Sequence, residues 1–379
     1  MSKKRHDGVK KPAPKRAPGN VSWRKKHKDL KKYREKKLLK EHSKKQLEEI
    51  EAADKNEQES SSDTTKKGRS YTVSIALPGS IMDNAQSPEL RSYLACQIAR
   101  AAVIFEVDEI IVFDESAQMT KQQAEMYVES STPAHPPNCN AKMVKILQYL
   151  ECPQYLRKFL FPLQQDLQYA GILNPLDCPH HLRADDFSIP YREAIVLNKP
   201  TRPGKGSFCN AGLTREVQVD KELQPNIRVT LELKTFDLSK KKLKAVVVSP
   251  MTPTRQCGYY WGYSVRLAKS LNSVFTECPF GERGYDVIIG TSDKGRAVDE
   301  FEMPEFKHVL IVFGGVKGIE SCIENDQSLR SVEDTSDLFH YYLNTCPNQG
   351  SRTIRTEEAL LITLSALRPK LRHANDLAT

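Results

Sequence analysis

Several features that would point directly to a function are missing from this chain of 379 residues. No apolar run is followed by a G-x-G-x-x-G pattern, which argues against a dinucleotide-dependent oxidoreductase. None of the nine cysteines forms a C-x-x-C pair, and their odd number and irregular spacing argue against a disulfide framework and a zinc site. No apolar run reaches the length of a membrane span and no signal peptide is recognisable, so we expect a soluble, intracellular protein without a membrane partner.

Positive charge is concentrated at the N-terminus. The first 45 residues hold 19 Lys/Arg and 4 Asp/Glu, whereas the rest of the chain holds 38 and 44, so the net charge of +9 comes from a tail. This tail begins with a Lys-, Pro- and Gly-rich segment that is typical of disorder. A helix-forming segment with almost no apolar face follows it. Together with a Ser-rich linker it makes up residues 1–69. Such a tail suits a nucleic-acid backbone, a nuclear address or an acidic partner, or it only keeps the protein soluble.

Residues 70–175 predict the first part of an α/β domain. An alternating strand at 71–80 precedes an amphipathic helix at 87–105, and a buried strand follows at 108–116. Because β-α-β crossovers are right-handed, the two strands are expected to lie parallel in one sheet.

Two acids end the second of these strands. Asp114 and Glu115 are secondary catalytic candidates as paired carboxylates, although acids in this position more often cap a helix or bind a ribose. The polar residues 116–140 predict a flexible surface excursion. Helix-forming sequence resumes at 141–161 and is broken at Pro153.

Adjacent histidines, His180 and His181, raise the question of a metal site. Such a site would need further ligands at short spacing, and only Cys178 and Asp185 are near in the sequence. We therefore predict no metal.

Residues 176–252 predict a small domain inserted into the α/β domain. Five short β-rich runs at near-regular spacing indicate a closed barrel. Basic residues lie among the runs, namely Lys199, Arg202, Lys205, Arg215 and Arg228. They favour an OB-like barrel that binds oligonucleotides, and a purely structural insertion is the alternative.

Residues 253–379 return to α/β sequence and contain a repeated pattern. Three apolar strands end in small, polar, Gly-containing loops within 285–295, 308–318 and 339–355. Each glycine alone has an ordinary use in a turn. Because the carboxyl ends of parallel strands meet at one edge of a sheet, the three loops together predict one site. Main-chain N–H and C=O groups would face a flat polar ligand there, such as an adenine nucleoside.

A helix is expected from Thr356 to Leu367. Thr356 would be its N-cap, followed by two glutamates at the positive end of the helix dipole. Its apolar residues cover a wide arc, of which one face can pack on its own sheet. The apolar residues outside that face predict a two-fold interface and therefore a homodimer. The alternative is a helix that is fully buried within one subunit.

Several stretches resemble a known family. IALPGSIMDNAQSPELRSYLACQIARA at 75–101 and NTCPNQGSRTIRTEEA at 344–359 are the longest of them. They resemble the SPOUT-domain RNA methyltransferases of the SpoU–TrmD superfamily, and among these the eukaryotic centromere protein 32 type. The resemblance covers roughly residues 70–370, including the barrel insertion.

This resemblance implies a fold and a cofactor. The expected fold is a parallel-sheet α/β SPOUT fold whose C-terminal part forms a deep trefoil knot, with the OB-like barrel inserted. S-adenosylmethionine would lie bent in the knot, held by three loops at 291–295, 313–318 and 344–354. The expected cofactor-binding residues are Thr291, Ser292, Lys294, Gly314, Gly315, Asn344, Thr345, Gln349, Gly350, Thr353 and Ile354.

Arg352 and Arg355 are the catalytic candidates, because guanidinium groups suit an RNA phosphate or the acceptor base. In the alternative, they hold the loop through backbone carbonyls and Glu357 or Glu358. The sequence identifies no general base.

An RNA methyltransferase is the function that these features favour. A non-catalytic RNA-binding or spindle scaffold that retains the cofactor fold is the main alternative. The resemblance implies RNA, a second copy of the chain and spindle or kinetochore proteins as partners. It also implies a location in the nucleus and cytoplasm, and at the spindle and centromere in mitosis. Neither the substrate RNA nor the methylated atom is visible in the sequence.

Overall fold

The computed structural model describes residues 68–129, 138–201, 205–234, 243–281 and 284–376. The basic tail and Arg202 lie outside these ranges. Within them, no helix is long and apolar enough to cross a membrane.

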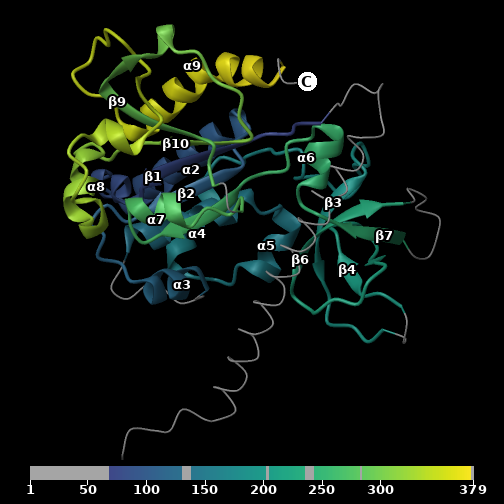
Figure 1. Cartoon of the computed structure of the whole chain (residues 1–379). Coiled ribbons are helices and arrows are strands. Elements are labelled where there is room, and N and C mark those ends of the chain that lie inside the picture. The colour runs from purple at the N-terminus through teal and green to yellow at the C-terminus, as the bar shows by residue number, and fades with distance from the viewer. Residues whose placement is uncertain (1–67, 130–137, 202–204, 235–242, 282–283, 377–379) are drawn as a thin grey trace, which may run out of the picture. The chain divides into compact units, whose positions relative to one another are not determined.

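A six-stranded, all-parallel sheet is the centre of the α/β part, in the order β11-β9-β10-β1-β2-β8 (Figure 1). It confirms the predicted parallel sheet. Its strands are β1 (Thr72–Pro78), β2 (Glu109–Phe113), β8 (Ser264–Ala268), β9 (Val287–Ala297), β10 (His308–Val312) and β11 (Tyr341–Asn344).

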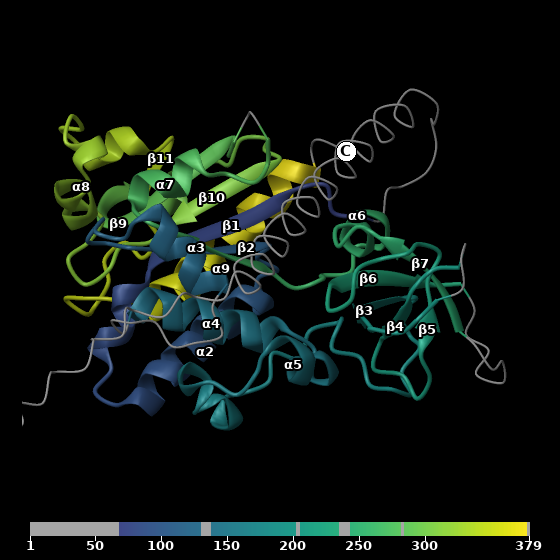
Figure 2. The ribbon, with the colours of Figure 1, turned by 90° about the horizontal axis from the view of Figure 1, so that it is seen from below.

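Helices cover both faces of this sheet (Figure 2). On one side lie α2 (Pro88–Ile104), α4 (Cys139–Glu151) and α9 (Thr356–Asp376), and on the other lie α7 (Leu271–Thr276) and α8 (Glu320–Asn325). Val73, Ile75 and Leu77 of β1 pack into the first layer, and Ala76 packs into the second, as the two-residue period of a strand requires. Shorter elements are α5 (Gln154–Leu160), α6 (Thr252–Cys257), η1 (Gly79–Asn84), η2 (Gln165–Leu167), η3 (Ala170–Ile172), η4 (Val298–Glu300), η5 (Gln327–Leu329) and η6 (Thr335–Leu338).

One predicted loop is partly a helix. The expected excursion at 116–140 contains α3 (Lys121–Glu129), and the prediction is wrong there. Thr120 and Gln123 begin this helix with a capping box, because each side chain accepts a hydrogen bond from the other's backbone N–H. Ala124 and Tyr127 then bury their side chains in the core. Residues 130–137 lie outside the described part of the chain.

The insertion is a closed five-stranded barrel, as predicted, in the order β3-β4-β5-β7-β6. Its strands are β3 (Tyr191–Val196), β4 (Phe208–Asn210), β5 (Val217–Gln218), β6 (Arg228–Leu233) and β7 (Leu243–Val248). Alternate side chains such as Ala194, Leu231 and Leu243 fill a core of its own.

Buried charges join the barrel to α4, and we call this group the junction cluster (Glu151, Glu193, Arg228, Thr230 and Trp261). Arg228 donates two hydrogen bonds to Glu151, at 2.6 and 2.9 Å, and one to Glu193 at 2.5 Å. Thr230 and Trp261 donate to the other oxygen of Glu193, at 2.5 and 2.7 Å. Burial opposes ionisation of Glu151, but the charge and hydrogen bonds of Arg228 outweigh it and lower the pKa of the carboxyl.

Candidate cofactor site

The first predicted loop is a bulge within a strand. β9 runs through 291–295, and the two consecutive β11 residues Tyr342 and Leu343 pair with Gly290 and Arg296. The five residues between these partners are therefore looped out of the ladder. Strand patterning alone predicted a strand end at this point.

Side chains bond this bulge to both neighbouring strands. The Thr291 hydroxyl donates to the carbonyl of Val312, the last residue of β10, at 2.9 Å. The Asn344 amide, at the end of β11, donates to the Asp293 carbonyl at 2.9 Å. The first and third predicted loops and the end of β10 thus meet at one edge of the sheet.

The second loop is a tight glycine turn. Gly315 and Gly318 form an isolated antiparallel bridge, and Gly318 has a φ of +77°, which favours glycine. A Cβ on Gly314 would lie 2.8 Å from the backbone of Gly318 and Ile319. At this position, close backbone approach alone requires glycine, so a ligand is not needed to explain it. The exposed part of the turn consists of Val316, which is 77% exposed, and Lys317.

Helix α9 joins the third loop to the second. Thr356 is its first residue and donates through its hydroxyl to the Gly314 carbonyl at 3.0 Å. The prediction of Thr356 as N-cap is therefore wrong. Arg355 precedes the helix instead, and its backbone N–H donates to the Glu358 carboxylate at 2.9 Å, as in half of a capping box.

Two further predicted residues of the first loop make local contacts. Lys294 forms a surface ion pair with Glu320 at 2.8 Å, which raises the pKa of the lysine. The Ser292 hydroxyl donates to Asp293 at 3.2 Å and accepts from the Lys294 backbone N–H. Lys294 is exposed, whereas Ser292 is half-buried.

The third loop is held by its own side chains. The hydroxyl groups of Thr345 and Thr363 lie 2.8 Å apart, which ties the loop to α9. Gln349 donates to the Ser351 carbonyl, and the Ser351 hydroxyl donates to the Thr353 carbonyl. These bonds shape the loop before any ligand arrives.

Arg352 and Arg355, the catalytic candidates, have exposed side chains. Within the described ranges neither guanidinium makes a hydrogen bond or ion pair, so the alternative that they hold the loop through Glu357 or Glu358 has no contact to support it. Gly350 is open, because a Cβ there would meet nothing within 4 Å, and Ile354 is half-buried. The arginines are therefore available to a ligand.

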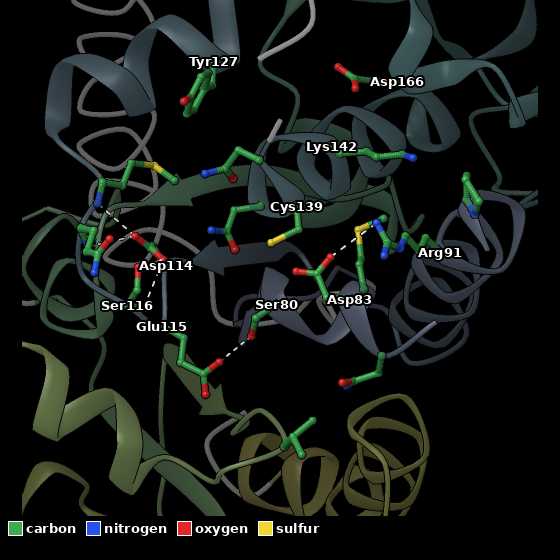
Figure 3. Close-up of a pocket in the computed structure, with 18 of the residues that line it drawn as sticks. Ser80, Asp83, Arg91, Asp114, Glu115, Ser116, Tyr127, Cys139, Lys142 and Asp166 are labelled. Atoms are coloured by element: carbon green, nitrogen blue, oxygen red, sulfur yellow. Dashed lines mark hydrogen bonds and ion pairs between the residues drawn. The ribbon is translucent and has the colours of Figure 1, made fainter. Parts of the chain in front are cut away.

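Sequence reasoning missed a groove of about 1250 Å³ beside the second loop. It lies at the carboxyl ends of β1 and β2 and reaches Val316 and Lys317 (Figure 3). Residues 138–142 and 165–169 contribute to its walls and carried no signal in the sequence. Asp114 has a structural use here, since its carboxylate accepts the backbone N–H groups of Ser116, Gln118 and Met119 and holds the turn after β2.

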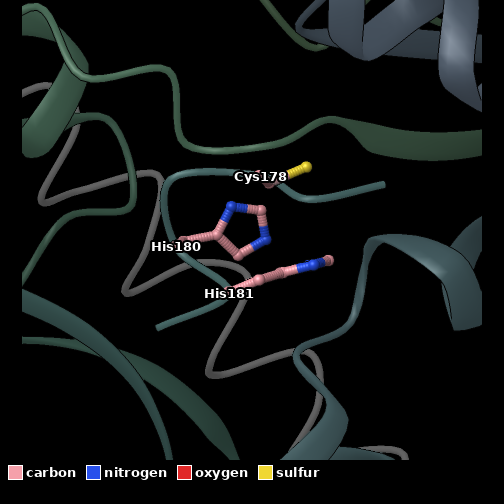
Figure 4. A group of neighbouring side chains, drawn as sticks. All are labelled: Cys178, His180 and His181. Atoms are coloured by element: carbon pink, nitrogen blue, oxygen red, sulfur yellow. The ribbon is translucent and has the colours of Figure 1, made fainter. Parts of the chain in front are cut away.

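Cys178, His180 and His181 form a compact group whose potential ligand atoms lie within 4.8 Å of one another (Figure 4). Both histidine Nε2 atoms lie within hydrogen-bonding distance of the Glu151 carbonyl, at 3.0 and 2.7 Å. Burial raises the pKa of the Cys178 thiol to about 12. We assign no metal to this group, and the sequence prediction stays a prediction.

The group predicts a pH effect on stability. Burial and the neighbouring His180 lower the pKa of His181 to about 4, from an ordinary value of about 6.5. The unfolded chain therefore binds a proton at His181 at a higher pH than the folded chain does. As a result, the free energy of unfolding decreases as the pH falls from about 6.5 to about 4. Between pH 7 and pH 4.5, we expect the free energy of unfolding of His181→Gln to decrease by on the order of 2 kcal/mol less than that of the wild type.

Urea unfolding at a series of pH values measures this effect. His373→Gln, at an exposed position near the end of α9, is the matched control and should keep the wild-type pH dependence. If the plots of unfolding free energy against pH were parallel for the wild type and His181→Gln, His181 would not be the source of the pH effect.

Comparisons with known proteins agree with this architecture. A family model described as "Putative RNA methyltransferase" matches residues 72–367. The chain is 54% identical over 308 residues to the 28S rRNA (uridine-N(3))-methyltransferase of Mus musculus, covering 81% of this chain and 78% of the relative. It is 37% identical over 370 residues to the putative methyltransferase spot-1 of Caenorhabditis elegans, covering 94% and 93%.

Among solved structures, the SpoU methyltransferase AviRb from Streptomyces viridochromogenes, in complex with AdoMet, matches with a TM-score of 0.30 and 10% identity. The match covers 82% of this chain and 62% of AviRb. A likeness this distant adds nothing to the assignment, which depends on the family model and the relatives. The predicted kinship with RNA methyltransferases is confirmed, whereas the knot and the centromere protein 32 type stay predictions. The chain belongs to the family of putative RNA methyltransferases.

Proposed function

We propose that this protein transfers a methyl group from S-adenosylmethionine to N3 of a uridine in large-subunit ribosomal RNA. The observation that carries the proposal is the meeting of three bonded loops at the bulge of β9 and the carboxyl ends of β10 and β11 in a chain of this family. The relatives from mouse and human, at 54% and 53% identity, are named for uridine-N(3) methylation of 28S rRNA and support this acceptor.

The loops suit a nucleoside-bearing cofactor. The bulge at 291–295 and the loop at 345–355 lie outside the ladder, so part of their backbone can bond a ligand, and Gly350 leaves open space. When bound, the cofactor supplies an electrophilic methyl group. The chain then has to align the acceptor for in-line attack and take the proton that N3 loses. Exposed Arg352 and Arg355 are placed to bind RNA phosphates.

The proposal is tested with the full chain, S-adenosylmethionine and in vitro transcribed large-subunit rRNA. We expect cofactor binding in calorimetry and incorporation of one methyl group at a uridine N3, located by mapping. Cofactor binding without methylation of any RNA would favour the scaffold alternative. The spindle and centromere association, and the location in nucleus and cytoplasm, remain proposals that the resemblance alone supports.

A homodimer built on α9 is part of the proposal. Leu360, Leu364 and Leu367 are buried within the chain, whereas Leu361 is 43% exposed, so less apolar surface is left than the helix pattern suggested. We expect wild-type protein to sediment as a dimer at micromolar concentration and Leu361→Asp to sediment as a monomer, because a charge would be buried in the interface. Leu163→Asp, at a fully exposed leucine, is the control. A monomeric wild type that still binds the cofactor would rule the dimer out.

The N-terminal tail is expected to add RNA affinity. With 19 Lys/Arg and 4 Asp/Glu in 45 residues, it should release counterions from RNA. Full-length protein should then show a steeper fall of log affinity with log salt than a chain beginning at Ser70, for any RNA sequence. Filter binding at several salt concentrations measures both slopes. Equal slopes would point to an address or a protein partner for the tail.

A further inference from the structure

The groove beside the second loop has the chemistry of a nucleotide site. Amide side chains are common in its wall, among them Asn84, Gln118, Gln123, Gln165 and Gln168, and Tyr169 adds an aromatic ring. Amides match the alternating acceptors and donor on the pairing edge of a uracil, and aromatic rings stack on bases. Arg91, Lys142 and Lys317 supply positive charge for a phosphate.

A buried acceptor in the wall lacks a partner. Asn140 is 4% exposed, and its side-chain oxygen makes no hydrogen bond with any residue that the structure describes. Leaving such a group unpaired costs about 1–3 kcal/mol, so a polar ligand that bonds it gains affinity. The oxygen itself is fully buried against Gly79, so a ligand in the groove can bond it only if the Asn140 side chain turns.

Glu115 is the acid that lies between the groove and the second loop. Its carboxylate accepts hydrogen bonds from Ser80 at 2.5 Å and Ser321 at 3.0 Å. A Cβ on Gly315 would lie 2.9 and 3.2 Å from the two carboxylate oxygens. Figure 3 shows Glu115 beside Ser80. Each oxygen keeps a lone pair, because an ionised carboxylate can accept about four hydrogen bonds.

We propose that this groove binds the acceptor uridine and that Glu115 is the general base that takes its N3 proton. The inference rests on the proposed function. N3 forms a bond to the methyl carbon while the bond from that carbon to the sulfonium sulfur breaks. The sulfur keeps the electron pair and leaves as S-adenosylhomocysteine, and the N3 proton passes to the Glu115 carboxylate and then to water. Two hydroxyl groups hold the carboxylate against the cofactor loop for this transfer.

Glu115→Gln tests the role, because it keeps the size and the contacts to both serines but cannot take the proton. We expect kcat on in vitro transcribed large-subunit rRNA to fall by about 100-fold or more, as is usual for loss of a general base. The remaining activity should keep rising with pH, because hydroxide then removes the proton, whereas the wild type reaches a plateau. Cofactor affinity in calorimetry and RNA affinity should change by less than about threefold.

Glu125→Gln is the matched control, since Glu125 is an exposed glutamate on α3 that does not line the groove. It should keep the wild-type pH profile. The assignment of Glu115 would be overturned if Glu115→Gln kept the wild-type kcat and pH profile, or if the pH profile changed in Glu125→Gln instead. An equal loss of cofactor binding and activity in Glu115→Gln would also overturn it, by showing a structural role. Failure of the wild type to methylate the RNA would instead contradict the proposed function.

Discussion

Replacing Arg228 with methionine is expected to lower the free energy of unfolding by about 3–5 kcal/mol, the usual cost of removing one partner of a buried ion pair. The guanidinium bonds Glu151 on α4 and Glu193 on β3, and these side chains are 9% and 4% exposed. Without the guanidinium, the two buried carboxylates either stay ionised without a cationic partner or take up protons. The barrel would then be less firmly attached to the α/β part, because Arg228 bonds both.

Urea unfolding at neutral pH measures this loss. Lys199→Met is the matched control, because Lys199 pairs with Glu216 on the surface, where both side chains are at least 41% exposed. We expect it to change stability by less than about 1 kcal/mol. Adding Glu151→Gln to the Arg228 variant should restore part of the stability, since it removes one uncompensated charge. A cost below 1 kcal/mol for Arg228→Met would show that the junction cluster contributes little.

Replacing Gly314 with valine is expected to weaken S-adenosylmethionine binding by about 100-fold, which corresponds to about 2.7 kcal/mol. Any Cβ at this position would lie 2.8 Å from the backbone of Gly318 and Ile319, so the turn itself must shift. Thr356 bonds the Gly314 carbonyl, and the start of α9 would move with it. The expected loss therefore comes from distortion of the turn and not only from a side chain in the space of the nucleoside.

Calorimetry measures the affinity, and circular dichroism checks that the sheet remains. Gly171→Val is the control, because a Cβ at Gly171 meets nothing within 4 Å and the position is distant from the loops in sequence. It should bind the cofactor like the wild type. Unchanged affinity in the Gly314 variant would mean that the second loop is not part of the cofactor site.

Local patterns predicted the elements well. Apolar runs and turn residues indicated five of the six strands of the sheet, all but β8, and all five strands of the barrel. Burial imposes a two-residue period on the side chains of a strand, and this period is visible in the local sequence. The helix predicted at 87–105 is α2 (Pro88–Ile104), and the Ser87 hydroxyl caps it by accepting a hydrogen bond from the Leu90 N–H. These signals lie within one turn or one strand of the chain.

Long-range contacts could not be predicted in this way. Glu151 and Arg228 are 77 residues apart, and neither position differs locally from an ordinary surface charge. Glu115 stood out only as an acid at a strand end, and its two serine partners come from β1's carboxyl end and from α8, 35 and 206 residues away. The bulge at 291–295 was missed for the same reason, since its pairing depends on β11.

The place of β1 in the sheet determines when this strand can pair during synthesis of the chain. β1 lies between β2 and β10, and Thr72 pairs beside His308, which is made 236 residues later. At about 5–20 residues per second, roughly 10–50 seconds pass on the ribosome before this partner exists. One edge of an apolar strand is open during that time, while the barrel can already close. The edge of β1 that pairs with β10 therefore stays without its partner until most of the chain has been made, and the cofactor loops form only after nearly the whole chain has emerged.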